Sequence, residues 1–233
     1  MSFCRYFFHY FFYVWFRASY RQRLINPLAL DQKQARMEVW RSFITSLIFA
    51  FSGTILVILW QKGYTQLYTE WSAFPWWYHP FSILAVLLIQ ETYYYWLHRW
   101  MHRPKIYRLV HKWHHDSIKT SALTAFSFHP IESVLQAIVL PLLILVLPLH
   151  LYLLFVLLIL MTLSSTVNHA GVEIFPKGFA KHWIGRWLVG ATHHDLHHKE
   201  FRYNFGLYFT FWDKWMETES PKFEKRFQEY TDF

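Results

Sequence analysis

The sequence predicts an all-α integral membrane protein, in which four transmembrane helices form two hairpins and a cytoplasmic helical cap carries histidine clusters. Three observations lead to this prediction. Of the 233 residues, 54% are hydrophobic and 16% are charged, against roughly 25% charged residues in soluble domains. Long stretches of the chain contain no charged residue. The 15 histidines equal the aspartates and glutamates in number, and the single cysteine excludes a disulfide framework.

The N-terminal segment, residues 1–41, contains an aromatic run from Phe3 to Phe16. This run is too short to cross a bilayer, which takes about 20 residues. It also lacks the small-residue cleavage site of a signal peptide. We therefore expect it to lie along the membrane interface.

The first two charge-free stretches predict the first hairpin. The stretch between Arg41 and Lys62 predicts a helix over residues 42–60, and the stretch before Glu91 predicts one over residues 80–98. No polar face recurs along these segments, as a helix of a soluble bundle would require.

The third charge-free stretch runs from Glu132 to Glu173. It is long enough for two crossings of about 20 residues each. We expect these helices at residues 132–147 and 149–167, with the turn at Pro148.

Two hairpins place residues 1–41, 98–131 and 168–233 on one side of the membrane. These segments hold 22 of the 23 Lys and Arg residues, and only Lys62 lies on the other side. The positive-inside rule then places the three segments in the cytoplasm. The net charge of +8 reflects this topology and attraction to anionic headgroups. Because the basic residues are scattered, a partner of nucleic-acid type is not expected.

Three histidine clusters fall on the cytoplasmic side. They are His98 and His102; His111, His114 and His115; and His193, His194, His197 and His198. In the second and third clusters, a pair three residues apart shares a helical face, with another imidazole directly beside it. Imidazole is a ligand for iron, zinc, copper or nickel. Eight to ten imidazoles exceed what one metal ion can use, so the clusters favour two metal ions with four or five ligands each. A buffering patch of surface histidines is the alternative.

Further short motifs accompany the clusters. They are Tyr95-Trp96-Leu97-His98-Arg99, Phe128-His129-Pro130-Ile131-Glu132, Asn168-His169-Ala170-Gly171, and Asn204-Phe205-Gly206 followed by Phe211-Trp212-Asp213. With the clusters, they resemble the sterol desaturase and fatty acid hydroxylase superfamily of membrane-bound, non-haem di-iron enzymes. The resemblance covers about residues 85–218, and the segment from Phe128 to Leu149 is most similar to the sterol C-5 desaturase-like branch. Glu91 and Glu132 stand where the superfamily more commonly has Asp.

The resemblance implies an oxidoreductase that uses O2 to hydroxylate or desaturate a lipid of sterol or fatty acyl type. It implies two iron ions as cofactors, and a separate electron-transfer protein, such as cytochrome b5 or a ferredoxin, as the electron donor. The implied metal ligands are His98, His102, His111, His114, His115, His169, His193, His194, His197 and His198. His129 stays open between metal binding and a structural role at a helix start, because Pro130 follows it.

Two carboxylates are candidate catalytic residues. Glu91 lies on one helical stripe with Tyr95, His98 and His102, and an ionisable group inside a membrane is usually functional. We expect Glu91 to orient a ligand or to receive a proton. Pairing with a polar group on a neighbouring helix is the alternative. Asp195, within the third cluster, is the second candidate, and Asp116 is similarly placed beside the second cluster.

The chain is expected to divide into an interfacial segment (1–41), a first transmembrane helix and loop (42–84), a catalytic domain (85–218) and a tail (219–233). A multi-pass location follows, in a bacterial inner membrane or the endoplasmic reticulum, with the active site on the cytoplasmic face.

Two other functions remain open. A zinc-dependent membrane hydrolase would need fewer imidazoles and a carboxylate base, for which Asp195 is the obvious candidate. A metal-binding or transport protein would need polar residues along the membrane core. The third and fourth predicted helices are almost wholly Leu, Ile and Val.

Overall fold

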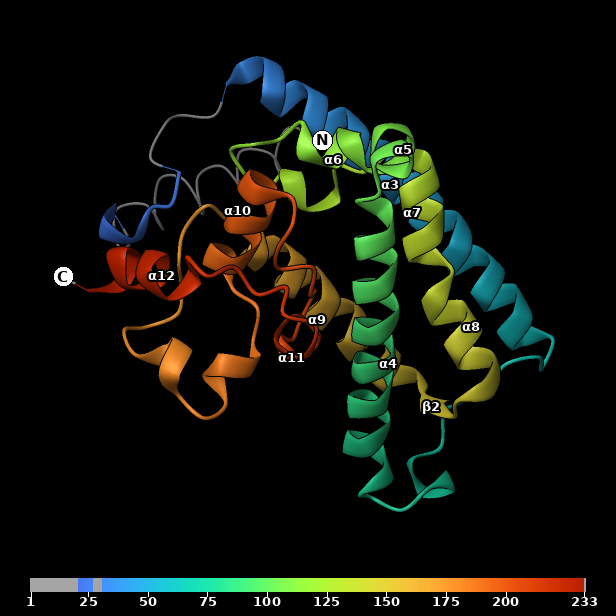
Figure 1. Ribbon diagram of the computed structural model, residues 1–233. Helices are drawn as coiled ribbons and strands as arrows, with labels where there is room; N and C mark the ends of the chain where they lie inside the picture. The colour runs from blue at the N-terminus through green and yellow to red at the C-terminus, as the bar shows by residue number, and fades with distance from the viewer. Residues whose placement is uncertain (1–20, 27–30, 233) are drawn as a thin grey trace.

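The computed structural model describes residues 21–26 and 31–232, and the chain in these ranges is mostly helical (Figure 1). The predicted all-α class is therefore confirmed. The aromatic run from Phe3 to Phe16, expected at the membrane interface, lies outside the described residues.

Each predicted transmembrane segment corresponds to helical structure. The helices are α3 (Gln32–Gln61), α4 (Tyr78–Met101), α7 (Pro130–Ala137) with α8 (Val139–Val146), and α9 (Leu151–Asn168). Helix α3 begins ten residues before the predicted start, at a side-chain cap in which Asp31 accepts a hydrogen bond from the Lys33 amide. The first turns of α3 lie beside the helical region that carries the histidine clusters. There the buried Glu38 accepts hydrogen bonds from Ser121 and Thr124.

The third predicted helix is divided near Ile138 into α7 and α8. Pro141 has no amide hydrogen, so the carbonyl of Ala137 loses its partner within the helix. The Ser52 hydroxyl of α3 donates to that carbonyl instead, at 3.2 Å. The division therefore follows from a proline, and the bond from α3 satisfies the carbonyl that the proline leaves free.

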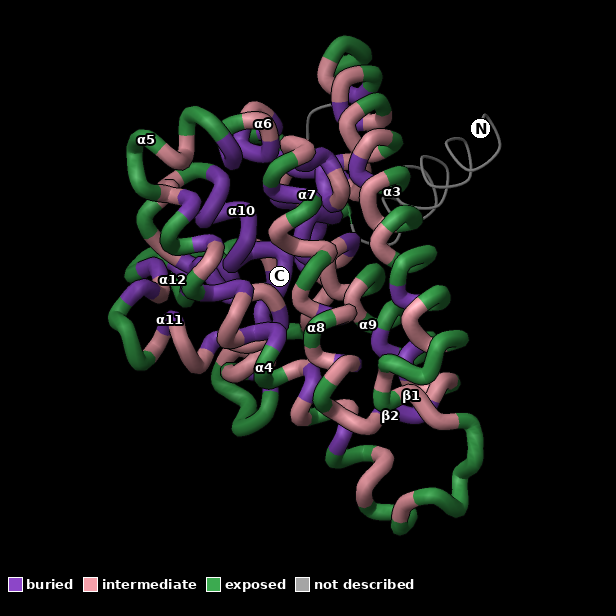
Figure 2. The backbone as a smooth tube through the Cα atoms, turned by 90° about the vertical axis from the view of Figure 1, so that its right-hand side faces the viewer, coloured by how far each residue is buried: buried purple, intermediate pink, exposed green. Residues whose placement is uncertain are grey.

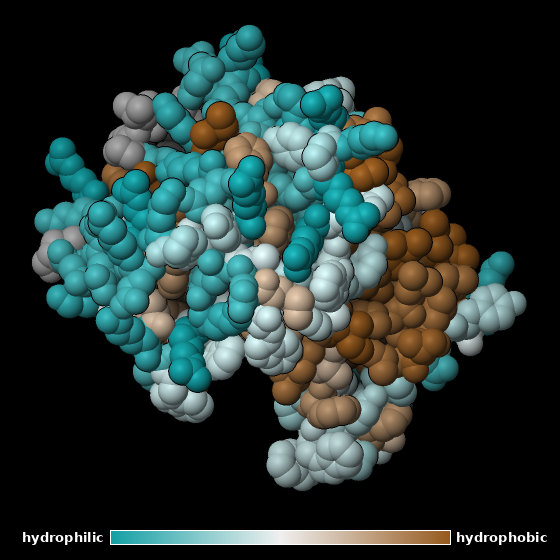
Figure 3. Space-filling model, viewed as in Figure 1, coloured by the Kyte–Doolittle hydropathy of each residue, from teal (hydrophilic) through white to brown (hydrophobic). Residues whose placement is uncertain are grey.

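Two of the described helices, α3 and α9, are long and apolar enough to cross a membrane. Their apolar side chains are largely exposed: Phe51 on α3 is 69% exposed and Ile159 on α9 is 58% exposed. Figure 3 shows a continuous apolar surface on the side where α7 and α8 lie, whereas the opposite part of the same face is hydrophilic. Exposed apolar area of this kind is typical of helices that face lipid.

The two loops that close the hairpins meet at one end of the molecule. Strand β1 (Leu67–Tyr68) follows α3, strand β2 (Leu149–His150) precedes α9, and the two pair in parallel (Figure 2). The predicted turn at Pro148 is confirmed, and the Tyr78 hydroxyl donates to its carbonyl at 2.9 Å.

Short helices form the cap at the opposite end. They are η2 (Arg21–Arg23), α5 (Pro104–Ile106), the π-helix η4 (Tyr107–His111), α6 (Lys112–His115), η5 (Thr124–Phe126), η6 (Phe179–Lys181), η7 (Gly185–Trp187), α10 (Ala191–Glu200), α11 (Phe211–Trp215) and α12 (Phe223–Thr231), while η3 (Trp71–Ala73) lies in the loop between α3 and α4. Figure 2 shows α10 at the buried centre of the cap.

Helix α10 is buried although it is polar. All residues from Ala191 to His198 are buried, and five of these eight are histidine or aspartate. The helix begins where Glu173 accepts hydrogen bonds from the amide and the hydroxyl of Thr192, at 3.0 and 2.6 Å. These bonds satisfy donors that a helix start leaves free. Because buried polar side chains need partners, a polar helix in this position indicates a functional site.

Candidate metal centre

Nine histidines converge in two groups within the cap. The five-histidine group contains His98, His102, His111, His115 and His197, and the four-histidine group contains His114, His169, His194 and His198. Within each group, one nitrogen from every ring lies within 4.8 Å of all the others. All nine are buried except His102, which is partly exposed. The division into five and four agrees with the ligand numbers expected for two metal ions.

Five elements supply these imidazoles. The end of α4 supplies His98 and His102, and the end of α9 supplies His169. Helices η4 and α6 supply the second sequence cluster, and α10 supplies the third.

The second and third sequence clusters each contribute to both groups, and histidines four residues apart in a cluster fall in the same group. His111 shares its group with His115, whereas His114 joins the other; on α10, His194 shares its group with His198, whereas His197 joins the other. The pairs three residues apart, which were expected to share a helical face, therefore contribute to different groups. A step of four residues turns a helix by about 40° and a step of three by about 60° in the opposite sense, so the pairs four apart point in more similar directions. The segment η4–α6 and helix α10 each serve both groups.

The distances between the inward nitrogens fit metal coordination. In the five-histidine group, four Nε2–Nε2 pairs lie 3.1 Å apart, namely His98–His111, His115–His111, His115–His197 and His102–His197. In the four-histidine group, the pairs His169–His114, His194–His169 and His198–His194 lie 3.2, 2.8 and 3.1 Å apart. Two nitrogens bound at right angles, about 2.1 Å from one metal ion, lie about 3 Å apart. The donor set and its spacing therefore fit a transition-metal ion in each group.

The outward nitrogens of four rings donate hydrogen bonds to the surrounding protein. The Nδ1 atoms of His98, His197 and His169 donate to the carbonyls of Phe205, Tyr203 and Ser165, at 2.9, 2.7 and 2.7 Å. The Nδ1 atom of His111 donates to Glu132, at 2.9 Å. These bonds place the proton on Nδ1 and leave the Nε2 lone pair facing the centre, which is the form that binds a metal.

Burial favours the neutral form of the grouped imidazoles. Burial lowers the pKa of His111, His114, His115, His194, His197 and His198 well below 6.5, and the neighbouring imidazoles lower it further. A neutral ring needs to lose no proton before it binds a metal ion.

Glu132 is a functional candidate that the sequence analysis did not single out. Its carboxylate is fully buried and accepts from His111 and from Gln136 Nε2, the latter at 3.1 Å. Its second oxygen has no hydrogen-bond partner among the described residues. The signal that could have identified it is its position, because it is an acidic residue at the start of a charge-free membrane segment.

Glu91 holds a loop rather than an imidazole. Its carboxylate accepts from the backbone amides of Leu207, Tyr208 and Phe209, at 3.1, 2.6 and 3.1 Å. The same loop carries the Phe205 carbonyl that accepts from His98. The structure thus places Glu91 behind the loop that orients His98. Its partners are backbone amides of that loop, rather than an imidazole or a polar group on a neighbouring helix.

Two predicted site residues point away from the histidine groups. The His193 ring stacks on Phe223, with centroids 3.5 Å apart, and its Nε2 lies 3.6 Å from Glu219. Asp195 accepts hydrogen bonds from Asn26 and Lys199, at 3.3 and 2.6 Å. Because consecutive helical residues differ in direction by about 100°, the intervening positions of α10 cannot all face the centre. The structure does not bring either residue to the groups.

The other two candidates also have local partners. His129 accepts from the Ile131 amide at the start of α7, at 3.3 Å, which is the structural role considered for it. Asp116 pairs with Arg41 and Lys112.

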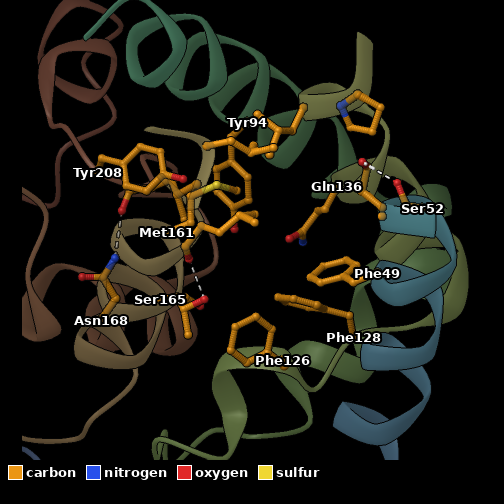
Figure 4. Close-up of a pocket in the computed structure, with 18 of the residues that line it drawn as sticks. Phe49, Ser52, Tyr94, Phe126, Phe128, Gln136, Met161, Ser165, Asn168 and Tyr208 are labelled. Atoms are coloured by element: carbon orange, nitrogen blue, oxygen red, sulfur yellow. Dashed lines mark hydrogen bonds between the residues drawn. The ribbon is translucent and has the colours of Figure 1, made fainter. Parts of the chain in front are cut away.

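An apolar pocket of about 250 Å³ adjoins the four-histidine group. Helices α3, α7, α8 and α9 form its walls, and His169 and His194 line it. Figure 4 shows Phe49, Phe126 and Phe128 on one side of the cavity and Met161 and Ser165 on the other. A molecule in this pocket would therefore lie against the four-histidine group.

Comparison with known proteins agrees with this arrangement. Residues 83–218, more than half of the chain, match the model of the family described as fatty acid hydroxylase. No solved structure matches the chain.

Three curated relatives illustrate the similarity. The chain is 27% identical over 201 residues to the Delta(7)-sterol 5(6)-desaturase ERG3B of Gibberella zeae, covering 86% of this chain and 61% of the relative. It is 29% identical over 161 residues to lathosterol oxidase of Rattus norvegicus, covering 68% of this chain and 52% of the relative. It is 28% identical over 206 residues to methylsterol monooxygenase 1 of Danio rerio, covering 86% of this chain and 69% of the relative. The matches thus span between half and about two thirds of the length of these relatives.

Proposed function

The chain belongs to the fatty acid hydroxylase family, and from this premise we propose that it is a membrane oxidoreductase that hydroxylates or desaturates a lipid. One observation carries the proposal. His169 and His194 belong to the four-histidine group and also line the apolar pocket. An apolar substrate in the pocket would therefore present a C–H bond to that group. The names of the relatives support a lipid of sterol or fatty acyl type.

The nine converging histidines are the proposed metal ligands, and His193 is left out because its ring stacks on Phe223. Two iron ions, with O2 and electrons from a separate donor such as cytochrome b5 or a ferredoxin, would supply the oxidising power that amino-acid side chains lack. Glu132 and the carbonyls behind His98, His197 and His169 would hold the rings in the orientation that this chemistry needs. The burial of the groups would keep bulk water from the reacting C–H bond.

The proposed topology has four membrane crossings, formed by α3, α4, α7–α8 and α9. The pairing of β1 with β2 supports it, because both hairpin loops lie at one end of the molecule. The histidine groups lie at the opposite end, and the sequence segments that the two-hairpin topology assigns to that side hold 22 of the 23 Lys and Arg residues. We therefore place the catalytic domain, residues 85–218, at the cytoplasmic face of a bacterial inner membrane or of the endoplasmic reticulum. That basic face would attract an acidic electron donor.

The test has two parts. Protein purified with iron supplied and zinc withheld is expected to hold two irons per chain, with the Mössbauer signature of a coupled pair. Incubated with a membrane lipid extract, O2 and reductant, it is expected to yield a lipid that has gained one oxygen atom or lost two hydrogen atoms. One bound zinc and no iron under these conditions would contradict the proposal and favour a hydrolase.

A further inference from the structure

The pocket beside the four-histidine group opens between α3 and α9. Gly53 of α3 and Leu158 and Thr162 of α9 line the pocket and are also exposed on the surface. These are the two helices that are long and apolar enough to cross a membrane. In the proposed topology, the mouth between them faces the hydrocarbon interior of the bilayer rather than water. From Leu158 to His169 the helix rises by about 16 Å, at 1.5 Å per residue.

The pocket wall contains no charged side chain. Among the described lining residues there is no Lys, Arg, Asp or Glu. A carboxylate or a phosphate buried along this wall would lose its hydration without gaining a cationic partner. The two lining histidines, His169 and His194, are metal ligands in the proposed function, so they do not supply a cationic partner. An uncharged ligand fits this wall, and an anionic headgroup does not.

Most polar groups along the wall already have partners in the protein backbone. The hydroxyls of Ser52, Thr162 and Ser165 donate to carbonyls, and Asn168 Nδ2 donates to the Leu207 carbonyl. These donors are therefore weak candidates for binding a ligand. Asn168 Oδ1 has no hydrogen-bond partner among the described residues, but it can only accept.

Gln136 differs from them. Its Nε2 donates one hydrogen bond to Glu132, at 3.1 Å, and the amide retains a second N–H and a carbonyl oxygen. Figure 4 shows this amide pointing into the cavity. It lies on α7 within a segment that is otherwise largely apolar, where a polar side chain is usually functional.

We propose that the pocket takes an uncharged lipid that carries a hydroxyl group, and that Gln136 binds this hydroxyl. The hydroxyl donates to the Gln136 carbonyl oxygen and accepts from its free N–H, while the apolar body lies along α9. The lipid enters from the bilayer beside Gly53. This assignment rests on the proposed function for the identity of the ligand as substrate, and it names the class of that substrate.

Equilibrium binding to metal-free, detergent-purified protein tests the proposal. The probes are cholesterol and 1-hexadecanol, each compared with its methyl ether and its sulfate ester. At least one alcohol is expected to bind about five- to tenfold more tightly than its ether, since one hydrogen bond contributes about 1 kcal/mol. The sulfate is expected not to bind. Equal binding of alcohol and ether, tight binding of the sulfate, or no binding of either alcohol would overturn the proposal.

Two variants locate the site. Gln136→Leu is expected to remove the preference for alcohol over ether while the ether still binds, because the apolar wall remains. Gly53→Phe is expected to weaken binding of the alcohol at least about tenfold by blocking the mouth. A Cβ at position 53 meets no atom within 4 Å, so the first carbon of the new side chain is accommodated without movement of the backbone.

Thr54→Phe is the matched control, because Thr54 is exposed and is not part of the pocket wall. It is expected to bind as the unmodified protein does, and circular dichroism verifies that each variant is folded. A retained preference in Gln136→Leu, or equal binding by the two phenylalanine variants, would refute the assignment. Because the binding assay uses metal-free protein, its result does not depend on iron loading. A failure to load iron would contradict the proposed reaction and would not affect the assignment of Gln136.

Discussion

Each imidazole at the centre has one nitrogen turned inward, and the rings that meet in a group come from different elements. His197 shows this arrangement, because its Nε2 lies 3.1 Å from both His102 and His115 and its Nδ1 is held by the Tyr203 carbonyl. Its ring is the contribution of α10 to the five-histidine group. A single residue of this kind is therefore expected to decide whether a metal is bound.

His197→Ala is predicted to lower iron affinity at least about a hundredfold, more than the loss of a group that only supports a ligand, and to abolish lipid oxidation. Iron content by plasma emission and product analysis by mass spectrometry measure both effects. His182→Ala is the control, because His182 is exposed and lies outside both groups. Full activity of the His197 variant would remove it from the ligand set.

Glu132→Gln is predicted to weaken metal binding about tenfold to a hundredfold with little change in fold. The neutral amide is a poorer acceptor for the His111 Nδ1 proton than the carboxylate, so the imidazole becomes a weaker ligand. Titration with a competing chelator measures the affinity. The exposed Glu70, in the loop at the far end of the molecule, provides the control Glu70→Gln. Equal affinities for the two variants would be inconsistent with a supporting role for Glu132.

Sequence reasoning at the residue scale found the histidines but not their grouping. Cluster spacing predicts which rings share a helical face, and it cannot say which face meets which neighbour. His169 has no neighbouring histidine in the sequence, so only the family resemblance identifies it as a ligand. Its partners come from α6 and α10. The link from Glu132 to His111 spans 21 residues and depends on the packing of α7 against η4.

At the scale of elements, the start of α10 is the critical junction. Glu173 accepts two hydrogen bonds from Thr192, and the helix that follows carries three of the nine grouped histidines. The hydroxyl bond helps to fix where α10 begins and therefore which way its histidines point.

Thr192→Val is predicted to destabilise the protein by about 1–3 kcal/mol, because Glu173 would keep its burial and lose a partner. Thr192→Ser retains the hydroxyl and is expected to stay close to the unmodified protein. Denaturant unfolding of the metal-free protein measures both. Equal stability of the two variants would argue against a role for this hydroxyl.

Element boundaries were predicted unevenly, for physical reasons. The turn at Pro148 and the ends of the charge-free stretches follow from composition alone. The early start of α3 depends on a local cap at Asp31 and on the burial of Glu38 by cap residues, which hydropathy does not report. The division of α7 from α8 follows from Pro141, which removes a helix hydrogen bond without changing the apolar character of the segment.

At the scale of the whole molecule, the apolar and polar surfaces are separated along the helices. The paired hairpin loops lie at one end, and the histidine-bearing cap lies at the other (Figure 1). The all-α class and the two long apolar helices were predictable from hydropathy. The four-crossing topology stays a prediction.

Cysteine accessibility tests this topology. In a Cys4→Ser background expressed in a bacterial inner membrane, Lys62→Cys is predicted to react with a membrane-impermeant thiol reagent added outside intact cells. Lys105→Cys is predicted to react only after permeabilisation. Both positions are exposed in the structure, so a lack of reaction reflects sidedness rather than burial. Labelling of both positions from outside would contradict two hairpins.

Because η4–α6 and α10 each serve both histidine groups, two metal ions bound there would be mechanically dependent on each other. A first ion would immobilise both helices, and the second ion would then meet rings whose conformational entropy has already been lost. Metal uptake is therefore expected to be cooperative. Native mass spectrometry during a metal titration should show chains with no ion and with two ions, and few with one.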